Sequence, residues 1–374
     1  MAALYVHIPF CQSRCIYCGF YSTTQMEQRQ RYVEALGREL QLRSDYLGSE
    51  PVRTVYIGGG TPSTLTEAQL STLISHLRDF TDGFRHVEEF TVECNPDDIS
   101  DDLARLLRQS GVNRVSMGAQ TFNDHRLRFL RRRHLAADIA VAMQRLRQAG
   151  IDNISIDLMY GFPDETLSDW IADVEAAIAL HPQHLSAYAL QYEEGTPLAR
   201  MLEQGQVAEA DEELSRQMYY DLKDRLAAAG YEHYEISNFA MPGRRSLHNS
   251  SYWQQVPYLG IGAAAHSYDG KSRQWNVSDL SRYIQGISNG HPVVEQEQLD
   301  DDTQYNELIM TRLRTAEGLP LSLLSPAQRD YCLKQAQRYI TDGLLVVTPQ
   351  CSISLTRRGI FVSDMVMADL MRAS

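Results

Sequence analysis

The sequence predicts an α/β fold, in which six strand–helix units curve into a partial barrel and a small C-terminal module of mixed helices and strands follows. Three observations lead to this prediction. Short apolar runs alternate with helical patterns over the first 230 residues, polar residues follow the ends of those runs, and the alternation stops near Tyr231. Strands that alternate with helices are typical of parallel sheets covered by helices.

The alternating region contains six apolar runs that are short enough to be buried strands. They lie at residues 4–8, 54–57, 90–93, 114–117, 154–158 and 185–190. Helical patterns separate them, beginning with an apolar stripe over residues 31–47. Thr66 and Gln69 form a capping box that opens the next helix, which we expect to continue to Leu77.

Polar or glycine-rich segments follow all six expected strands. In chain order these are a cysteine-rich loop, a glycine run, Glu93, Gln120, Asp157 and Gln191. Functional groups gather at the carboxyl ends of strands both in barrels and in open doubly wound sheets. Six contributions converge on one site more readily when the sheet curves, so we expect a TIM-like (βα)6 partial barrel over residues 1–230. Its open side would admit a large substrate.

The pattern changes from residue 231 onward. Residues 231–300 are expected to form a connecting segment, with a strand at 231–236 and an irregular stretch at 241–276 that is rich in glycine, aromatic residues and histidine. Residues 301–374 show two helices, two short strands and a last helix, the order of a winged-helix-like α+β module. Its eight acidic and eight basic residues balance, which favours a lid or docking role over DNA binding.

Composition narrows the class of protein. The formal net charge is -13, which argues against a nucleic-acid surface, since such a surface needs lysine and arginine to replace counterions. No apolar run approaches the roughly twenty residues that span a bilayer, and no secretory signal precedes the first strand. Six cysteines in 374 residues without such a signal indicate a reducing compartment. We expect a soluble cytoplasmic protein.

Three cysteines close to the start of the chain are its most informative feature. Cys11, Cys15 and Cys18 follow a C-x-x-x-C-x-x-C spacing. A cubane [4Fe–4S] cluster usually takes one cysteine per iron, so three ligands leave one iron open for chemistry. A zinc site with His7 as fourth ligand and a disulfide are the alternatives. The remaining cysteines are interpreted as ordinary thiols, namely Cys94, Cys332 and Cys351.

This spacing, the aromatic Tyr17 before the third cysteine, and the glycine run at residues 58–62 together resemble the radical S-adenosylmethionine superfamily. The resemblance implies that S-adenosylmethionine chelates the open iron. One electron, from a donor such as flavodoxin or ferredoxin, would then cleave the cofactor and yield a 5′-deoxyadenosyl radical. The cofactor would supply the chemistry and the protein its position and electronics.

The same resemblance assigns residues to the cofactor pocket. These are Tyr5, Tyr17, Gly59, Gly60, Thr61, Glu93, Gln120, Arg132 and Asp157. The glycines would meet the methionine end of the cofactor, and Glu93 would bind the ribose hydroxyls. Other interpretations stay open, since a glycine run can be a plain turn, Arg132 lies in a run of three arginines, and Asp157 could pair within the barrel.

Three further stretches, at residues 5–10, 116–122 and 157–163, narrow the resemblance to one branch of the superfamily. It contains the oxygen-independent coproporphyrinogen III oxidases and the HemW family of haem chaperones. The oxidases carry a fourth cysteine where this chain has Phe20, and an N-terminal extension where only ten residues precede Cys11. Both differences favour the chaperones.

The motif H-N-x-x-Y-W, typical of the chaperones, is also present. It comprises His248, Asn249, Tyr252 and Trp253. Imidazole is a good axial ligand for haem iron, and aromatic rings supply flat apolar area for a macrocycle. A structural histidine with aromatic neighbours is the alternative. No catalytic residue is assigned.

The resemblance thus implies a haem chaperone that holds a [4Fe–4S] cluster, S-adenosylmethionine and haem, and delivers haem to an acceptor protein. That acceptor could belong to respiration and bring peripheral membrane contact. Radical decarboxylation of coproporphyrinogen propionates is the alternative function, and an unrelated radical methyltransferase is a third.

Overall fold

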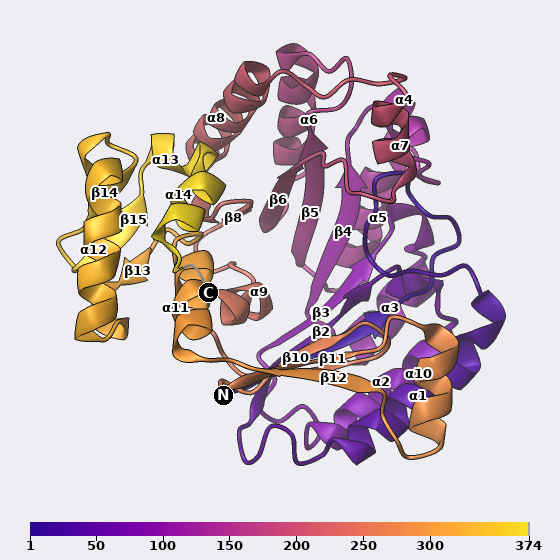
Figure 1. The fold of residues 1–374 in the computed structure, drawn as a ribbon. Helices are drawn as coiled ribbons and strands as arrows, with labels where there is room; N and C mark the ends of the chain where they lie inside the picture. The colour runs from indigo at the N-terminus through magenta and orange to yellow at the C-terminus, as the bar shows by residue number, and fades with distance from the viewer. Residues whose placement is uncertain (373–374) are drawn as a thin grey trace.

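A computed structural model describes residues 1–372, and Figure 1 shows its fold. A twelve-stranded sheet curves through most of the chain, and its six central strands are parallel neighbours in chain order. They are β1 (Ala2–Ile8), β2 (Val52–Gly59), β3 (Glu89–Cys94), β4 (Arg114–Gln120), β5 (Asn153–Tyr160) and β6 (His184–Ala189). All six predicted strands are therefore present as one parallel set.

Helices follow these strands and cover the outer face of the curved sheet (Figure 1). They are α1 (Arg29–Leu42), α2 (Glu67–Phe80), α3 (Asp101–Gln109), α4 (Asp124–Phe129), α5 (Ala136–Gln148), α6 (Leu167–Ala179), α7 (Pro197–Glu203) and α8 (Glu212–Ala228). The predicted capping box is present, because the N–H of Gln69 donates to the Thr66 hydroxyl (3.3 Å) and the Thr66 N–H donates to the Gln69 side chain (3.0 Å). The first helix is shorter than predicted and ends at Leu42 rather than near residue 47.

Six more strands extend the sheet beyond both ends of the parallel set. They are β7 (Glu232–Glu235), β8 (Asn238–Ala240), β9 (Tyr258–Ile261), β10 (His266–Tyr268), β11 (Ser272–Asn276) and β12 (Val294–Gln298). β8 pairs antiparallel with β6, whereas β9 pairs parallel with β1. β12 and β7 lie at opposite ends of the strand order, so the sheet does not close and the barrel is partial, as predicted.

The prediction that residues 241–276 are irregular was wrong. This stretch contains a helix, α9 (Leu247–Trp253), and β9, β10 and β11. The strands hold only three to five residues each, too few to show a periodic pattern, and tertiary contacts fix them. Buried Glu39 of α1 accepts hydrogen bonds from the N–H of Gly262 and from Asn276 Nδ2, both at 2.8 Å. Tyr283 donates its hydroxyl to the same carboxylate (2.6 Å).

Tyr283 belongs to α10 (Leu280–Ser288), after which the chain reaches a C-terminal module. The module contains α11 (Asp301–Arg312), β13 (Leu319–Pro320), α12 (Pro326–Thr341), β14 (Leu345–Val347), β15 (Ser352–Leu355), α13 (Arg357–Phe361) and α14 (Ser363–Leu370). Its strands form a separate sheet in the order β13-β15-β14, with a hydrophobic cluster of its own. Arg314 pairs with buried Glu235 (3.0 Å) and ties this module to the edge of the barrel.

The inner face of the barrel is polar, which is unusual because barrel interiors are typically filled by branched aliphatic residues. Side chains of a strand alternate between its two faces. The apolar set packs under the helices. The alternate set includes Thr54, Tyr56, Glu89, Thr91, Glu93, Arg114, Ser116, Ser155, Asp157, His184 and Ser186. We call the space enclosed by this set the lumen. Within residues 1–372, no helix combines the length and apolar character needed to cross a membrane.

Candidate functional site

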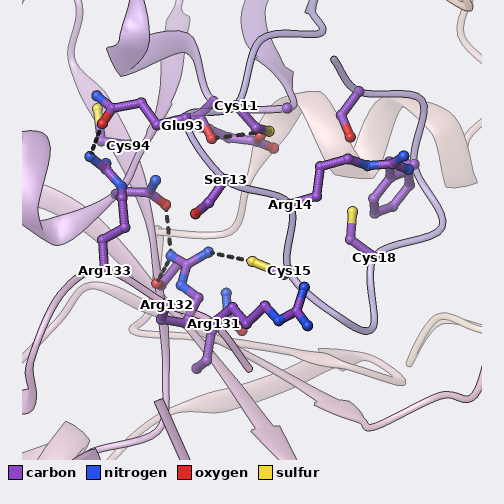
Figure 2. Close-up of a pocket in the computed structure, with 18 of the residues that line it drawn as sticks. Cys11, Ser13, Arg14, Cys15, Cys18, Glu93, Cys94, Arg131, Arg132 and Arg133 are labelled. Atoms are coloured by element: carbon purple, nitrogen blue, oxygen red, sulfur yellow. Dashed lines mark hydrogen bonds between the residues drawn. The ribbon is translucent and has the colours of Figure 1, made fainter. Parts of the chain in front are cut away.

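The three predicted cysteines lie on the loop that follows β1 and line one pocket at the carboxyl ends of the strands (Figure 2). Backbone bonds hold the loop in place, since the N–H of Cys11 donates to Thr23 (2.9 Å) and that of Cys18 to Cys15 (3.4 Å). All three thiols are partly exposed and none is in a disulfide. Burial raises the pKa of Cys11 and of Cys18, and a hydrogen bond from Thr61 partly offsets this effect at Cys11.

Within residues 1–372, no three histidine, cysteine or carboxylate side chains converge on one position for a single ion. A cubane cluster does not need such convergence, because each thiolate binds a different iron. The thiols of Cys11, Cys15 and Cys18 instead border a shared pocket, which is the arrangement a cluster requires.

The glycine run after β2 forms the wall of the pocket nearest to Cys11. Gly59 has φ +110°, and a Cβ there would lie 2.6 Å from the His7 ring. A Cβ at Gly60 would lie 2.8 Å from the Pro9 carbonyl carbon and 3.0 Å from Cys11 Sγ. Both positions therefore exclude any side chain, and the backbone is left open to the pocket. Next to them, the hydroxyl of Thr61 lies 3.6 Å from Cys11 Sγ.

Glu93 lies at the end of β3 and faces the same pocket. Its carboxylate accepts a hydrogen bond from the Tyr56 hydroxyl (2.6 Å) and one from the N–H of Gly59 (3.1 Å). Burial raises the pKa of Glu93 to about 7, while the Tyr56 bond acts in the opposite direction. Two of its lone pairs are used, so the carboxylate can still accept further hydrogen bonds from a ligand.

Arg131, Arg132 and Arg133 all line the pocket, and Arg132 is the least exposed of the three. Its Nη2 donates to Asn95 Oδ1 and to the carbonyl of Gly118, both at 2.7 Å, and its Nη1 lies 3.6 Å from Cys15 Sγ. Its Nε is buried without a partner, which leaves one N–H for an anionic ligand. The flanking arginines, 131 and 133, are exposed on the rim.

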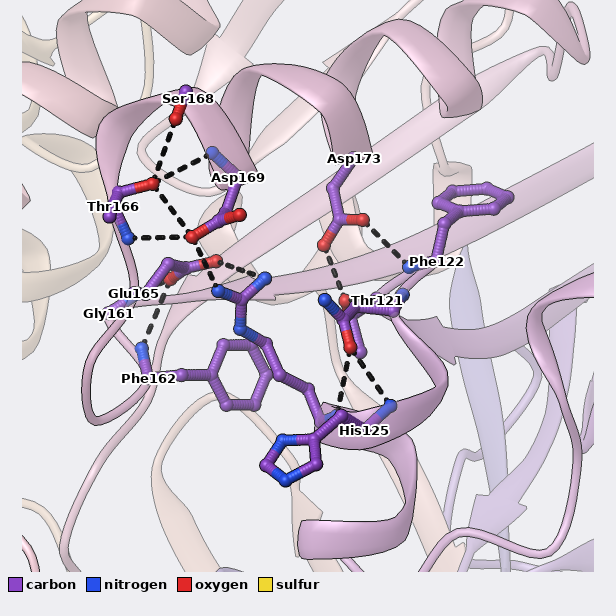
Figure 3. Close-up of polar contacts among 12 residues, drawn as sticks. Thr121, Phe122, His125, Gly161, Phe162, Glu165, Thr166, Ser168, Asp169 and Asp173 are labelled. Atoms are coloured by element: carbon purple, nitrogen blue, oxygen red, sulfur yellow. Dashed lines mark hydrogen bonds and ion pairs between the residues drawn. The ribbon is translucent and has the colours of Figure 1, made fainter.

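Gln120 ends β4 with φ +68°, a backbone conformation that residues other than glycine rarely adopt. Neighbouring contacts hold this turn in place (Figure 3). Asp173 of α6 accepts hydrogen bonds from the Thr121 hydroxyl and from the N–H of Phe122 (2.9 Å). The hydrogen bonds to Asp173 thus stabilise the turn and offset the energetic cost of the left-handed conformation at Gln120.

A second cluster anchors α4, the helix that leads to Arg132 (Figure 3). Arg126 of α4 pairs with Asp169 (2.9 Å) and lies 3.6 Å from Glu165. Glu165 also accepts from the N–H groups of Gly161 (2.7 Å) and Phe162 (3.1 Å). Burial raises the pKa of Glu165 to about 7.

The remaining predicted pocket residues fall into two groups. Tyr17 and Asp157 line the pocket, and Asp157 accepts from the Ser116 hydroxyl at 3.3 Å. Tyr5 lies deeper, inside the barrel, where its ring centroid is 6.1 Å from that of Tyr56. Its hydroxyl contacts the Nδ1 of His7 (3.1 Å), so the structure places it behind the pocket wall.

The motif at residues 248–253 lies at the opposite end of the lumen, on α9. His248 is only 1% exposed and both of its ring nitrogens have partners. Its Nδ1 lies 2.9 Å from the Thr54 hydroxyl, and its Nε2 lies 2.9 Å from the Tyr252 hydroxyl. The ring also stacks on Tyr56, with centroids 4.9 Å apart. Burial lowers the pKa of His248 to about 3, so the ring is neutral.

The other two motif residues lie partly exposed. Asn249 and Trp253 are one helical turn apart on α9, and the guanidinium of Arg314 lies 5.1 Å from the Trp253 ring. The indole Nε1 of Trp253 has no hydrogen-bond partner. The motif therefore splits into a buried face and a face that a ligand can reach.

The sequence prediction missed Asn95, Arg14 and His134, which also line the pocket. Asn95 directly follows β3 and holds Arg132, so the rule that places functional groups at strand ends could have found it. The Nε2–H of His134 donates to the Ala119 carbonyl (3.1 Å), a contact without a sequence signal.

Comparison with known proteins identifies the family. Residues 5–177 match the radical SAM superfamily and residues 299–362 match the HemN C-terminal domain. The heme chaperone HemW of Mycobacterium tuberculosis is 35% identical, over 98% of this chain and 94% of the relative. That of Bacillus subtilis is 36% identical, over 85% of each chain. The chain belongs to the HemW family. The resemblance drawn from the sequence motifs is thereby confirmed.

This chain shares its fold with a solved enzyme. The structure of coproporphyrinogen III oxidase (HemN) from Escherichia coli, a radical SAM enzyme, superimposes with a TM-score of 0.83. The match covers 99% of this chain and 90% of that chain at 24% sequence identity. HemW of Escherichia coli itself is 32% identical over 85% of this chain.

Proposed function

We propose that this protein is a haem chaperone that carries a [4Fe–4S] cluster and S-adenosylmethionine and passes haem to an acceptor protein. The observation that carries the proposal is the similarity to haem chaperones over nearly the whole chain, at 35% identity to the mycobacterial relative. Phe20, which is 71% exposed where the oxidases have a cysteine, supports the same reading.

In this proposal the pocket in Figure 2 holds both cofactors. Cys11, Cys15 and Cys18 bind the cluster, and the backbone of Gly59 and Gly60 lies against the methionine end of S-adenosylmethionine. When bound, this pair supplies one-electron cleavage chemistry. Because Gly59 and Gly60 carry no side chain, the space beside Cys11 stays open.

The polar residues of the pocket would orient the cofactor. The free N–H of Arg132 could donate to the carboxylate of S-adenosylmethionine, and the remaining lone pairs of Glu93 could accept from its ribose hydroxyls. Thr61, Gln120 and Asp157 complete the polar lining, and Tyr17 adds an aromatic wall. Tyr5 supports this set from behind, through its packing on Tyr56.

Haem would lie against α9 at the other end of the lumen. Asn249 and Trp253 provide the accessible face, and Tyr252 lies beside them. The neutral ring of His248 can coordinate iron, but its Nε2 first has to break the hydrogen bond with the Tyr252 hydroxyl. Haem coordination by His248 therefore competes with one hydrogen bond.

Cleavage of S-adenosylmethionine further requires a one-electron donor, such as a flavodoxin or ferredoxin. Haem delivery requires an acceptor protein that uses haem. We place the protein in the cytoplasm, where a reduced cluster and free thiols persist. An acceptor of the respiratory chain would bring it to the membrane surface.

Two anaerobic assays test the function, both on the reduced, cluster-loaded protein. Titration with haem should produce a stoichiometric absorbance band, and incubation with coproporphyrinogen III and S-adenosylmethionine should yield no protoporphyrinogen over many turnovers. Sustained decarboxylation would replace the chaperone by the oxidase. Within the motif, H248A should abolish the haem band, whereas Y252F should keep or strengthen it, because Nε2 loses its competitor. A wild-type band in H248A would remove His248 as the ligand.

A further inference from the structure

The lumen contains one buried cation that no carboxylate contacts. Arg114, at the start of β4, is 1% exposed. Its Nε and Nη1 have no hydrogen-bond partner, and none of the ion pairs within residues 1–372 includes it. An unpaired guanidinium is costly to bury, so its charge has to be balanced at longer range.

Three carboxylates share the lumen with Arg114, and each is engaged elsewhere. Glu89 accepts from the N–H groups of Leu247 (2.8 Å) and His248 (2.9 Å) at the start of α9. Glu93 accepts from Tyr56 and Gly59, and Asp157 accepts from Ser116. Arg114 is thus left as the countercharge shared by Glu93 and Asp157, which lie on β3 and β5, the strands on either side of β4.

The charge of Arg114 acts on both pocket carboxylates in the same direction. Burial raises the pKa of Glu93 and of Asp157, and Arg114 opposes that rise at both groups. Asp157 also raises the pKa of Glu93, since the two acids repel each other when both are ionised. Removing Arg114 would leave burial and repulsion opposed only by the hydrogen bonds that these carboxylates accept.

Other titratable groups that face these acids are neutral near pH 7. They are Tyr5, Tyr56, Cys94, Tyr188, His184, Tyr234, His248 and Tyr252. Burial raises the pKa of the tyrosines and of Cys94, and lowers that of His184 and His248. Arg132, at the pocket wall, is engaged with Asn95 and Gly118. Two cations therefore lie near these acids, Arg114 inside the lumen and Arg132 at the pocket wall.

We infer that Arg114 is a positioning residue for S-adenosylmethionine: without touching the cofactor, its charge favours the ionised form of Glu93 and Asp157. This inference rests on the proposed pocket and adds a residue to it. Arg114 acts from the layer beneath, because Ser116, two residues further along β4, lines the pocket while Arg114 does not. A guanidinium suits this task because it stays charged when buried, whereas a lysine readily loses its proton.

The test measures the affinity of the cluster-loaded protein for S-adenosylmethionine by calorimetry between pH 6 and pH 9. R114Q should bind roughly fivefold more weakly than wild type at pH 7, because a rise of about one pKa unit lowers the ionised fraction of Glu93 by that factor, and should recover to within about threefold at pH 9. R114K should bind more tightly than R114Q at pH 7. A profile for R114Q that runs parallel to that of wild type would overturn the inference, because a purely structural role gives the same loss at every pH.

Two controls separate this inference from the proposed pocket. E93Q, which cannot ionise, should bind weakly at every pH. If E93Q and D157N both bind as wild type does, the pocket assignment fails and the role of Arg114 fails with it. If R114Q does not fold, the charge-balanced variant R114Q/D157N is measured instead, and its pH profile of affinity is compared with that of D157N. Its affinity should then reach a plateau at a higher pH than that of D157N, and coincident profiles would overturn the inference.

Discussion

The two ends of the lumen contain the same kinds of side chain but use them differently. At the α9 end, buried Glu89 and His248 have all their hydrogen bonds made within the protein. At the cofactor end, Glu93 keeps free lone pairs and Arg132 keeps an unpartnered Nε. Polar groups that are satisfied internally stabilise a fold, whereas groups left open await a ligand.

Whether a polar group already has its hydrogen-bond partners within the protein indicates a binding site more reliably than residue type does. A buried glutamate occurs at both ends of β3, yet Glu89 joins two elements and Glu93 faces a pocket. Substitution of Glu89 should therefore affect stability first, and substitutions at the cofactor end should affect binding first. The predictions below test that division.

The largest effect is expected at the cysteine loop. C15A should abolish the broad visible absorbance of anaerobically reconstituted protein, because two thiolates cannot hold a four-iron cluster. Iron and sulfide analysis measures the loss. C351A, which removes an exposed thiol of the C-terminal module, is the matched control and should keep a full complement. Four irons and four sulfides in C15A would show that Cys15 is not a ligand of the cluster.

The α9 end should respond to E89Q with a loss of stability. An amide oxygen replaces only part of a carboxylate that accepts from two N–H groups and from the Ser246 hydroxyl (3.3 Å). We expect a loss of about 2–4 kcal/mol in the free energy of unfolding by urea, as for other buried charged hydrogen bonds. E88Q, at the neighbouring exposed glutamate, should change it by less than about 0.5 kcal/mol. Equal effects of both variants would contradict the proposed division.

The cofactor end should respond to E93Q with a loss of affinity. S-adenosylmethionine should bind more weakly by roughly 1–3 kcal/mol, the cost of a charged hydrogen bond, while the free energy of unfolding stays at or above that of wild type. Stability is not lost because burial disfavours the ionised carboxylate of Glu93, and an amide oxygen can still accept a hydrogen bond from Tyr56 or Gly59. Unchanged affinity by calorimetry, on folded variant protein, would remove Glu93 from the pocket.

The sequence predicted what depends on local pattern and strand order. The six parallel strands follow from their apolar runs, and the placement of Glu93, Gln120 and Asp157 follows from the rule that strand ends carry function. The cysteine spacing needs no structure to be recognised. These signals lie within a few residues of one another.

Features that depend on long-range contacts could not be predicted. The burial of His248 follows from Thr54, which is 194 residues away in the chain. The unpaired state of Arg114 follows from what Glu89 and Glu93 contact elsewhere. No periodicity records such contacts, so the motif itself did not indicate that the His248 ring is enclosed.

The smallest effect should come from Glu165, which belongs to neither end and supports the pocket from outside the barrel. Burial raises the pKa of Glu165 to about 7, above its ordinary value, so the folded state holds this proton more tightly than the unfolded state. Its contribution to stability is therefore fully present at low pH and is lost as the pH rises from about 5 through 7. E165Q keeps an acceptor for Gly161 and Phe162 but cannot ionise, so the decline between pH 5 and pH 8 should shrink by roughly 1–2 kcal/mol. Urea unfolding at both values measures this change, and S168A, on an exposed neighbour, should leave the decline intact. An equally steep decline in E165Q would show that Glu165 ionises freely and that another group carries the pH dependence.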